Sequence, residues 1–247
     1  MLPEIRAKVG YVVPSTNTTA QTEIDDLRPS GVTNHIARMT IRDSLMVEQP
    51  GFDRVLEDMR ASAAPAIASL CTADPDIVAI GVSPEAFWNG PESHAKVIAA
   101  FENESGGRPV VTSADAITVA LEQLGNLSRV GVITPYLKLG DDTVRKFFDD
   151  RGYEVVAIEG MGAKTPTSIA EIGARDLRAA LVAVNQPDTE VIVQVGTNVA
   201  MSRFAAAAEF FFDKPVLSNN AVLYWHALRR LGVQDRFEGF GRIFQHH

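Results

Sequence analysis

The chain has 247 residues, of which 46% are hydrophobic and 22% charged, a composition typical of a globular protein with one large or two modest cores. Its net charge of −8, without a basic run, excludes the electrostatic footprint of a nucleic-acid binder or of a protein held on anionic membrane. One cysteine, Cys71, cannot form an internal disulfide, no Cys/His cluster has zinc spacing, and the N-terminus has no signal core. We therefore expect a cytoplasmic protein without a metal or a membrane span.

Short apolar segments rich in β-branched residues alternate with amphipathic segments along the chain. Buried strands are predicted at residues 9–13, 77–82, 130–133, 154–158 and 191–195. Helices are predicted at residues 18–27, 51–70, 114–124, 141–151, 169–184 and 219–231. This alternation predicts an α/β fold with mainly parallel sheets flanked by helices.

Four of the predicted strands run into polar turns that precede a helix. These turns are Pro14-Ser15-Thr16-Asn17, Ser83-Pro84-Glu85, Thr134-Pro135-Tyr136 and Gly196-Thr197-Asn198. Ligands of open α/β sheets bind outside the carboxyl ends of the strands, where helix N-termini present free N–H groups. The turns therefore predict an anion-binding pocket.

Three pairs of segments repeat in the same order along the chain. VGYVVPSTNTT matches VGVITPYLKLG, PDIVAIGVSPEAF matches TEVIVQVGTNVAM, and GRPVVTSADAITVALEQLG matches DKPVLSNNAVLYWHALRRLG. The repeats predict two pseudo-symmetric lobes, residues 1–115 and 116–225, with residues 226–247 folded back on the first lobe. A cleft between lobes is a favoured ligand site.

The segments VVPSTNT, GVITPY, VGTNVA and KPVLSNNAVLYWHALRRLG resemble the aspartate/glutamate racemase superfamily, in its maleate cis–trans isomerase and arylmalonate decarboxylase branch. The resemblance covers nearly the whole chain. It implies two lobes with the active site between them, no metal or organic cofactor, a small carboxylate or cyclic amide as substrate, and a dimer. Typical members place one catalytic cysteine on each lobe, on opposite faces of the substrate.

This sequence departs from the family pattern at both cysteine positions. Ser83 stands at the first and Gly196 at the second. Cys71 lies upstream of its strand, where we expect an unreactive thiol at a helix end. Thiol chemistry therefore cannot be transferred to this chain unchanged.

The first and second lobes each offer a turn that the resemblance assigns to substrate carboxylate. Asn17, with Ser15 and Thr16, either caps a helix or binds the carboxylate. Tyr136 is expected to hydrogen-bond the carboxylate or a developing enolate, or to be an aromatic residue at the cleft edge. Both turns therefore stay candidates for substrate binding.

The Ser83-Pro84-Glu85 turn carries the remaining candidates for chemistry. Ser83 either caps a helix or contacts substrate, and it becomes a nucleophile only with a neighbouring base. Glu85 is a candidate for that acid–base role. Trp88, shortly after this turn, either walls the pocket or belongs to the core.

The second lobe offers a polar turn that mirrors the first. Gly196 would let backbone N–H groups approach a ligand, while Thr197 and Asn198 either bind carboxylate or cap a helix. Thr167 and, in the first lobe, Pro84 are further candidates for substrate binding, although the segment around Thr167 mainly begins a helix.

These candidates support three hypotheses. The first is a cofactor-independent isomerase or lyase that acts on a small carboxylate through an enolate, with Tyr136 and Ser83 as hydrogen-bond donors. The second is a hydrolase of a small amide or lactone that uses Ser83 as nucleophile. The third is a carboxylate-binding protein without catalysis, because both family thiols are absent.

Overall fold

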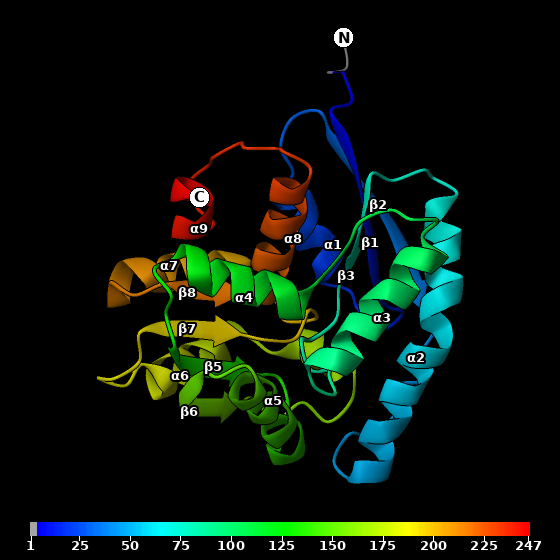
Figure 1. Ribbon diagram of the computed structural model, residues 1–247. Helices are drawn as coiled ribbons and strands as arrows, with labels where there is room; N and C mark the ends of the chain where they lie inside the picture. Colours follow the sequence, from blue (N-terminus) through cyan, green and yellow to red (C-terminus); the bar gives the residue numbers. More distant parts are fainter. Residues whose placement is uncertain (1–3) are drawn as a thin grey trace.

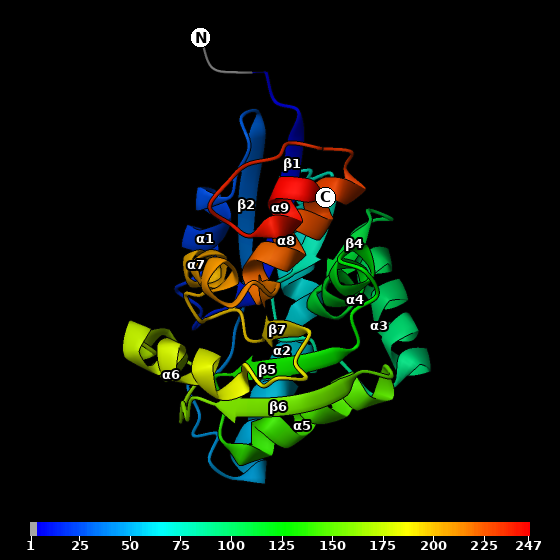
Figure 2. The same ribbon diagram turned by 90° about the vertical axis from the view of Figure 1, so that its left-hand side faces the viewer.

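Two four-stranded, all-parallel sheets with helices around them make up the computed structural model, which describes residues 4–247 (Figures 1 and 2). The first sheet has the order β2-β1-β3-β4, with β1 (Ala7–Pro14), β2 (Val32–Met39), β3 (Ile77–Ile80) and β4 (Val110–Thr112). The second has the order β6-β5-β7-β8, with β5 (Arg129–Thr134), β6 (Glu154–Gly160), β7 (Val191–Gln194) and β8 (Val216–Ser218). The predicted α/β fold class is confirmed.

The helices connect the strands of each sheet. Those up to β5 are α1 (Ala20–Asp26), α2 (Gln49–Cys71), α3 (Pro91–Glu104) and α4 (Ser113–Gln123). Those after β5 are α5 (Lys138–Asp150), the 3₁₀ helix η1 (Ser168–Glu171), α6 (Ala174–Val184), α7 (Ser202–Phe212), α8 (Asn219–Arg230) and α9 (Arg242–His246). Within the described residues no helix has the length and apolarity that a bilayer crossing needs.

The repeated sequence segments occupy matching places in the two sheets. Gly10 of β1 and Gly131 of β5 hold the same position in the two opening motifs. A Cβ atom on Gly10 would lie 2.8 Å from Leu70 Cδ2 of α2, and one on Gly131 would lie 2.6 Å from the carbonyl oxygen of Val184 in α6. In both places, glycine allows a helix to pack closely on a central strand.

The central strands of each sheet set the position of the site. All strands are parallel, but the order in which the chain adds them to the sheet reverses between β1 and β3: β2 lies on one side of β1 and β3 on the other. The same reversal occurs between β5 and β7. Loops that leave the two strands of such a pair diverge to opposite faces of the sheet, which opens a crevice at their carboxyl ends. Both sheets therefore offer a binding crevice at the turns that the sequence singled out.

Helices α4 and α8 lie side by side between the sheets, and α8 also packs against β3, β4 and β8 (Figure 1). Buried side chains from both sheets and both helices belong to one hydrophobic cluster. The C-terminal segment contacts both halves: Arg6 pairs with Asp235, and the Arg242 N–H donates to Glu209 Oε2 of α7 (2.7 Å). The division at residue 115 and the attachment of residues 226–247 to the first lobe remain predictions.

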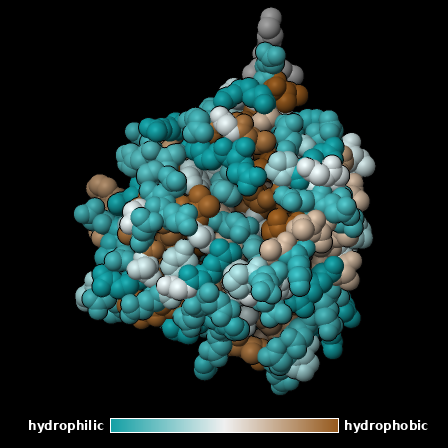
Figure 3. Space-filling model, in the orientation of Figure 1, coloured by the Kyte–Doolittle hydropathy of each residue, from teal (hydrophilic) through white to brown (hydrophobic). Residues whose placement is uncertain are grey.

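One face of the molecule is largely hydrophilic, and hydrophobic residues show on it mainly as scattered spots (Figure 3). The most exposed large apolar side chains among the described residues include Phe210 and Phe211 of α7 and Leu45 in the loop before α2. Phe210 and Phe211 pack edge-on against each other, with ring centroids 5.8 Å apart.

Candidate active site

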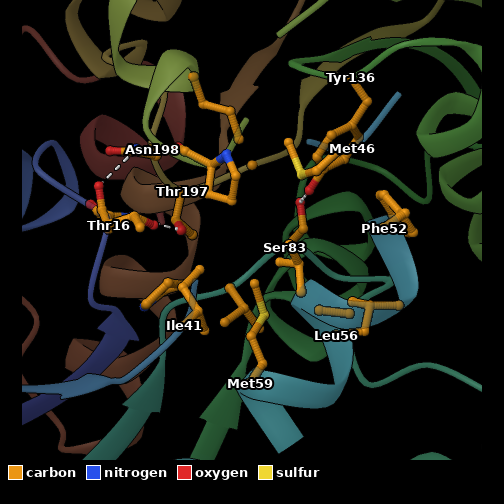
Figure 4. A pocket seen from close by; sticks show the side chains of 18 of the residues that line it. Thr16, Ile41, Met46, Phe52, Leu56, Met59, Ser83, Tyr136, Thr197 and Asn198 are labelled. Atoms are coloured by element: carbon orange, nitrogen blue, oxygen red, sulfur yellow. Dashed lines mark hydrogen bonds between the residues drawn. The ribbon is translucent and has the colours of Figure 1, made fainter. Parts of the chain in front are cut away.

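A pocket with a cavity volume of about 50 Å³ lies where the turns after β1, β3, β5 and β7 meet (Figure 4). Its polar lining consists of Thr16, Asn17, Ser83, Glu85, Tyr136, Thr197 and Asn198. Among the described residues, none that line it is a lysine, arginine or histidine. A carboxylate bound here would therefore be held by neutral donors and not by a formal positive charge.

Tyr136 and Ser83 meet in the pocket although they come from different sheets. The Tyr136 hydroxyl donates a hydrogen bond to Ser83 Oγ over 3.0 Å (Figure 4). Burial raises the pKa of Tyr136 well above its usual 10, and the nearby Glu85 carboxyl adds to that rise. Tyr136 therefore keeps its proton at neutral pH and acts as a hydrogen-bond donor.

Glu85 is the ionisable group of this pocket that titrates near neutral pH. Its side chain is buried, and burial raises the pKa of its carboxyl from the usual 4.5 to about 7, although hydrogen bonds from its own backbone, Tyr136 and Ser83 oppose the rise. Its Oε2 atom is buried without a hydrogen-bond partner among residues 4–247. A carboxyl group with this pKa can both donate and accept a proton under physiological conditions.

The turn after β5 fixes the Tyr136 ring. The Tyr136 N–H donates to Thr134 Oγ1 (3.1 Å), and the Thr134 hydroxyl in turn donates to Asp141 of α5. Phe52 of α2 packs edge-on against the ring, with centroids 5.9 Å apart. These contacts hold the phenol hydroxyl toward Ser83.

Asn17 and Thr197 form the polar contact between the other two turns. Asn17 Oδ1 accepts hydrogen bonds from the N–H groups of Thr19 (3.1 Å) and Ala20 (2.9 Å), which satisfies the start of α1. Its Nδ2 donates to Thr197 Oγ1 (3.0 Å), and the Thr197 hydroxyl donates to the carbonyl of Gly81 (2.9 Å). Asn17 lines the pocket as predicted, but its amide is used to cap a helix and to join the two sheets.

The side-chain amide of Asn198 also hydrogen-bonds to the surrounding loops. Its Nδ2 donates to the carbonyls of Thr16 (3.3 Å) and Pro166 (3.0 Å), and its Oδ1 accepts from the Thr18 N–H (2.9 Å). With both amide hydrogens used, the side chain has no donor left for a ligand. Asn198 therefore positions loops around the pocket.

The backbone after β7 supplies further donors. Gly196 has φ +94°, which suits glycine, and a Cβ added there would lie 2.9 Å from Pro135 Cγ and 3.8 Å from Ser83 Oγ. The N–H groups of Gly196, Thr197 and Asn198 have no hydrogen-bond acceptor among residues 4–247. Successive free N–H groups are a common feature of anion-binding loops.

The other half of the pocket is apolar. Its larger side chains include Ile41, Met46, Phe52, Leu56 and Met59 (Figure 4), together with Val55 and Ile169. Four of these residues lie on one face of α2, at the spacing 52, 55, 56 and 59 that a helix gives to a single face. The sequence shows this stripe, but the stripe alone does not reveal that it faces the pocket.

Four residues of the predicted site do not line this pocket. Ser15 exchanges hydrogen bonds with the backbone of Ile41, Pro84 is buried beside the pocket, and Thr167 is exposed, where its N–H and hydroxyl donate to Asp43 (2.9 and 2.6 Å). Trp88 packs on α5 instead of walling the pocket. They are therefore better explained as residues that position loops than as substrate ligands.

The single thiol lies away from the pocket lining. Cys71 is the last residue of α2, half-buried, with its Sγ 3.8 Å from the carbonyl oxygen of Ser105. Among the described residues, no group of three His, Cys, Asp or Glu side chains could hold a metal ion. The reactive groups that the pocket offers are therefore Glu85, Ser83 and Tyr136.

Comparison with known proteins agrees with this arrangement. The maleate isomerase of Pseudomonas putida is 23% identical over 249 residues, which cover 96% of each chain. A cysteine-to-serine variant of the Nocardia farcinica maleate cis–trans isomerase, solved with a covalently bound succinylcysteine intermediate, superposes with a TM-score of 0.87 at 24% identity, covering 98% of this chain and 99% of that one. A liganded double variant of arylmalonate decarboxylase gives a TM-score of 0.83 at 20% identity, covering 98% of this chain and all of the other.

The sequence model of one family matches almost the whole chain. It is the arylmalonate decarboxylase family model, and the match extends over residues 9–244, which include both sheets and every residue of the pocket. These homologues indicate an isomerase or lyase. The chain belongs to the arylmalonate decarboxylase family.

Proposed function

We propose that this protein is a cofactor-independent decarboxylase of small malonates that carry an apolar substituent, with Glu85 as its proton donor. The observation that carries the proposal is the buried Glu85 carboxyl, with a pKa of about 7, beside the hydroxyls of Tyr136 and Ser83. Proton transfer at neutral pH is most effective when the pKa of the donor lies near the working pH. Glu85 thus has the property that a thiol supplies elsewhere in the family.

The two halves of the pocket suit the two ends of such a substrate. One carboxylate binds to the hydroxyls of Tyr136 and Ser83 and to the free N–H groups after β7. The apolar substituent packs against the α2 face around Phe52 and Met59. The second carboxylate then lies in a poorly solvated environment, where loss of its charge is favourable.

The reaction needs no metal and no covalent adduct. The bond between the α-carbon and the poorly solvated carboxylate breaks, CO₂ leaves, and the electron pair passes into an enediolate on the remaining carboxylate. Tyr136, Ser83 and the backbone N–H groups stabilise the enediolate charge, which is the contribution that fixed donors make to catalysis. The Glu85 carboxyl then donates its proton to the α-carbon and recovers a proton from water.

The thiol-free pocket argues against isomerisation through a cysteine adduct. The succinylcysteine seen in the Nocardia farcinica enzyme needs a cysteine beside the substrate, and Cys71 does not line this pocket. The hydrolase and the non-catalytic binding protein have no support from the homologues, which are isomerases and a decarboxylase.

The test is an NMR assay in deuterated buffer with phenylmalonate, alkenylmalonates and maleate as substrates. We expect CO₂ release from the malonates with one deuterium added at the α-carbon. Glu85→Gln should remove turnover, and Tyr136→Phe should lower kcat by about 10²-fold, the usual effect of losing one oxyanion donor. Turnover of maleate alone, or full activity in Glu85→Gln, would overturn the proposal.

A further inference from the structure

The turn that carries Glu85 is anchored twice. The N–H of Ala86 donates to the carbonyl of Ser83 (3.1 Å), and the N–H of Trp88 donates to the carbonyl of Glu85 (3.0 Å). Phe87 packs edge-on against Phe101 of α3, with ring centroids 5.2 Å apart, which holds one side of the turn to the first sheet's helices. The neighbouring Trp88 is held by the second sheet's helices instead.

Three residues at the end of α5 hold the Trp88 ring. Its indole N–H donates to Asp150 Oδ2 (3.0 Å), and Phe147 packs edge-on against it, with ring centroids 5.2 Å apart. The Arg151 guanidinium carbon lies 4.5 Å from the ring centroid, within the range of a cation–π interaction. Trp88 is therefore fixed by a hydrogen bond, an aromatic contact and a cation.

Arg151 is itself fixed by α4. Its Nη1 donates to Thr118 Oγ1 (2.9 Å), and its Nη2 lies 3.4 Å from Asp115 Oδ1. Asp115 also bonds His94 Nε2 of α3 (2.9 Å), and the His94 ring lies 5.4 Å from that of Trp88. We call Trp88, Arg151, Asp150, Asp115 and His94 the Trp88 clasp.

The clasp spans the two halves of the molecule beside the pocket but takes no part in its lining. Trp88 does not line the pocket, and neither does any other member of the clasp. Its ionisable side chains are His94, Asp115, Asp150 and Arg151. Lys146 pairs with Asp150 (2.7 Å), and His226 of α8 lies near Asp115. The ionisable neighbour of Glu85 itself is Tyr136. Any effect of the clasp on the pocket must therefore pass through the turn at residues 84–87.

We propose that Trp88 is a positioning residue that, clamped on α5, holds the turn at residues 84–87 so that Glu85 stays buried beside Ser83 and Tyr136. The inference rests on the proposed function, because it specifies how the proton donor is held. The backbone N–H of Trp88 donates to the Glu85 carbonyl, while its indole is held on α5, so a displacement of Trp88 also displaces the backbone of Glu85. Phe87 alone would leave the turn attached on one side.

Loss of the contacts that hold Trp88 should change the pKa of Glu85, which a general loss of stability would not do. Once the turn is released, water reaches the Glu85 carboxyl, and the burial that raises its pKa is lost. The titration midpoint of this one carboxyl then falls toward that of an ordinary glutamate. Asp150 also loses the indole hydrogen bond that lowers its pKa, so the other glutamate carboxyls, none of which belongs to the clasp, serve as the reference.

The experiment is a ¹³C NMR titration of protein labelled at the glutamate carboxyl carbons, with Glu85 assigned by its absence in Glu85→Gln. We expect Trp88→Ala to lower the Glu85 midpoint by about one pH unit or more, and Arg151→Met to lower it less. Trp88→Phe, which keeps the aromatic contact with Phe147, should lie between Trp88→Ala and the parent. Arg145→Met is the control on α5, since Arg145 donates to Val155 away from the clasp. Trp225→Phe is the control for loss of an indole outside the clasp.

The outcomes separate this inference from the proposed function. The inference about Trp88 depends on the difference in the Glu85 titration midpoint between variant and parent. It is overturned if this midpoint is the same in the parent, Trp88→Phe and Arg151→Met. If Trp88→Ala does not fold, the other two variants decide. The proposed function depends on the parent alone, and it fails if the Glu85 midpoint is that of an ordinary carboxyl or if Glu85→Gln keeps full activity.

Discussion

Glu85 shows how one residue can serve function at a cost to stability. A buried carboxyl with a raised pKa binds its proton more tightly in the folded than in the unfolded protein. Its stabilising effect is complete below pH 4.5, the usual pKa, and is lost as the pH rises to about 7. Above that pH a charge is buried without a cationic partner in the pocket.

The first prediction is that Glu85→Gln raises stability at high pH while it removes activity. A difference between a pKa of 4.5 and one of about 7 corresponds to ~3 kcal/mol of unfolding free energy. The unfolding free energy of the variant minus that of the parent should therefore be up to ~3 kcal/mol larger at pH 8 than at pH 4.5. Urea unfolding at several pH values measures this difference.

A matched control separates the burial of Glu85 from the loss of a charge. Glu122→Gln removes a carboxylate from the exposed side of α4. It should follow the parent's pH dependence. If Glu85→Gln and Glu122→Gln change stability alike from pH 4.5 to pH 8, Glu85 is not a buried acid with a raised pKa.

At the scale of elements, α2 carries the apolar half of the pocket. Phe52, Val55, Leu56 and Met59 lie on one face of this helix and line the pocket together. Met59 is only half-buried, so its side chain can change without removal of a core residue. This helix face should therefore set which substituent the substrate can carry.

The second prediction is that Met59→Ala shifts preference toward bulkier substrates. Removal of the thioether enlarges the apolar half, so kcat/KM for a naphthylmalonate should rise relative to phenylmalonate by about tenfold. Met59→Leu, which nearly conserves volume, should leave the ratio close to that of the parent. The ratio is measured with both substrates in one reaction. An unchanged ratio in Met59→Ala would place the substituent elsewhere.

The sequence predicted the elements whose pattern is strong and missed those whose pattern is weak. The alternation of buried runs and helices, and the order of the repeats, predicted parallel α/β sheets, as observed. Strand β2 was missed because it is an edge strand with half-buried polar residues, and β4 and β8 because they have three residues each. Helix α9 was also missed, and α3 and α7 were expected only as helices that follow the polar turns, without bounds.

The site was predicted at the level of turns but not of contacts. Ser83, Glu85 and Tyr136 line one pocket, as their strand-end positions indicated. The apolar stripe of α2 and the side on which Trp88 packs were not predicted, because periodicity shows which face of an element is apolar but not what that face meets. The use of Asn17 as a helix cap was one of two interpretations that the sequence left open, and its hydrogen bond to Thr197 of the other sheet was not predicted.

At the scale of the whole molecule, the two sheets supply unequal chemistry to one pocket. The first sheet contributes Glu85, whose carboxyl gains and loses its proton near neutral pH. The second contributes Tyr136, which keeps its proton at neutral pH, and Gly196, which has no side chain. A planar enolate has two faces, and a fixed acid can reach only the face that it meets. The unequal halves should therefore make the product chiral.

The third prediction is that a prochiral substrate gives one enantiomer. Decarboxylation of methyl(phenyl)malonate should yield 2-phenylpropionate with one configuration in large excess, measured by chiral chromatography, because Glu85 delivers its proton from one side. The purified product, returned to the enzyme in deuterated buffer, should exchange its α-hydrogen with retention, since the same carboxylate removes and returns the proton on the same face. Racemic product, or exchange with racemisation, would require a second proton source on the opposite face of the enolate and would contradict Glu85 as the single acid of this pocket.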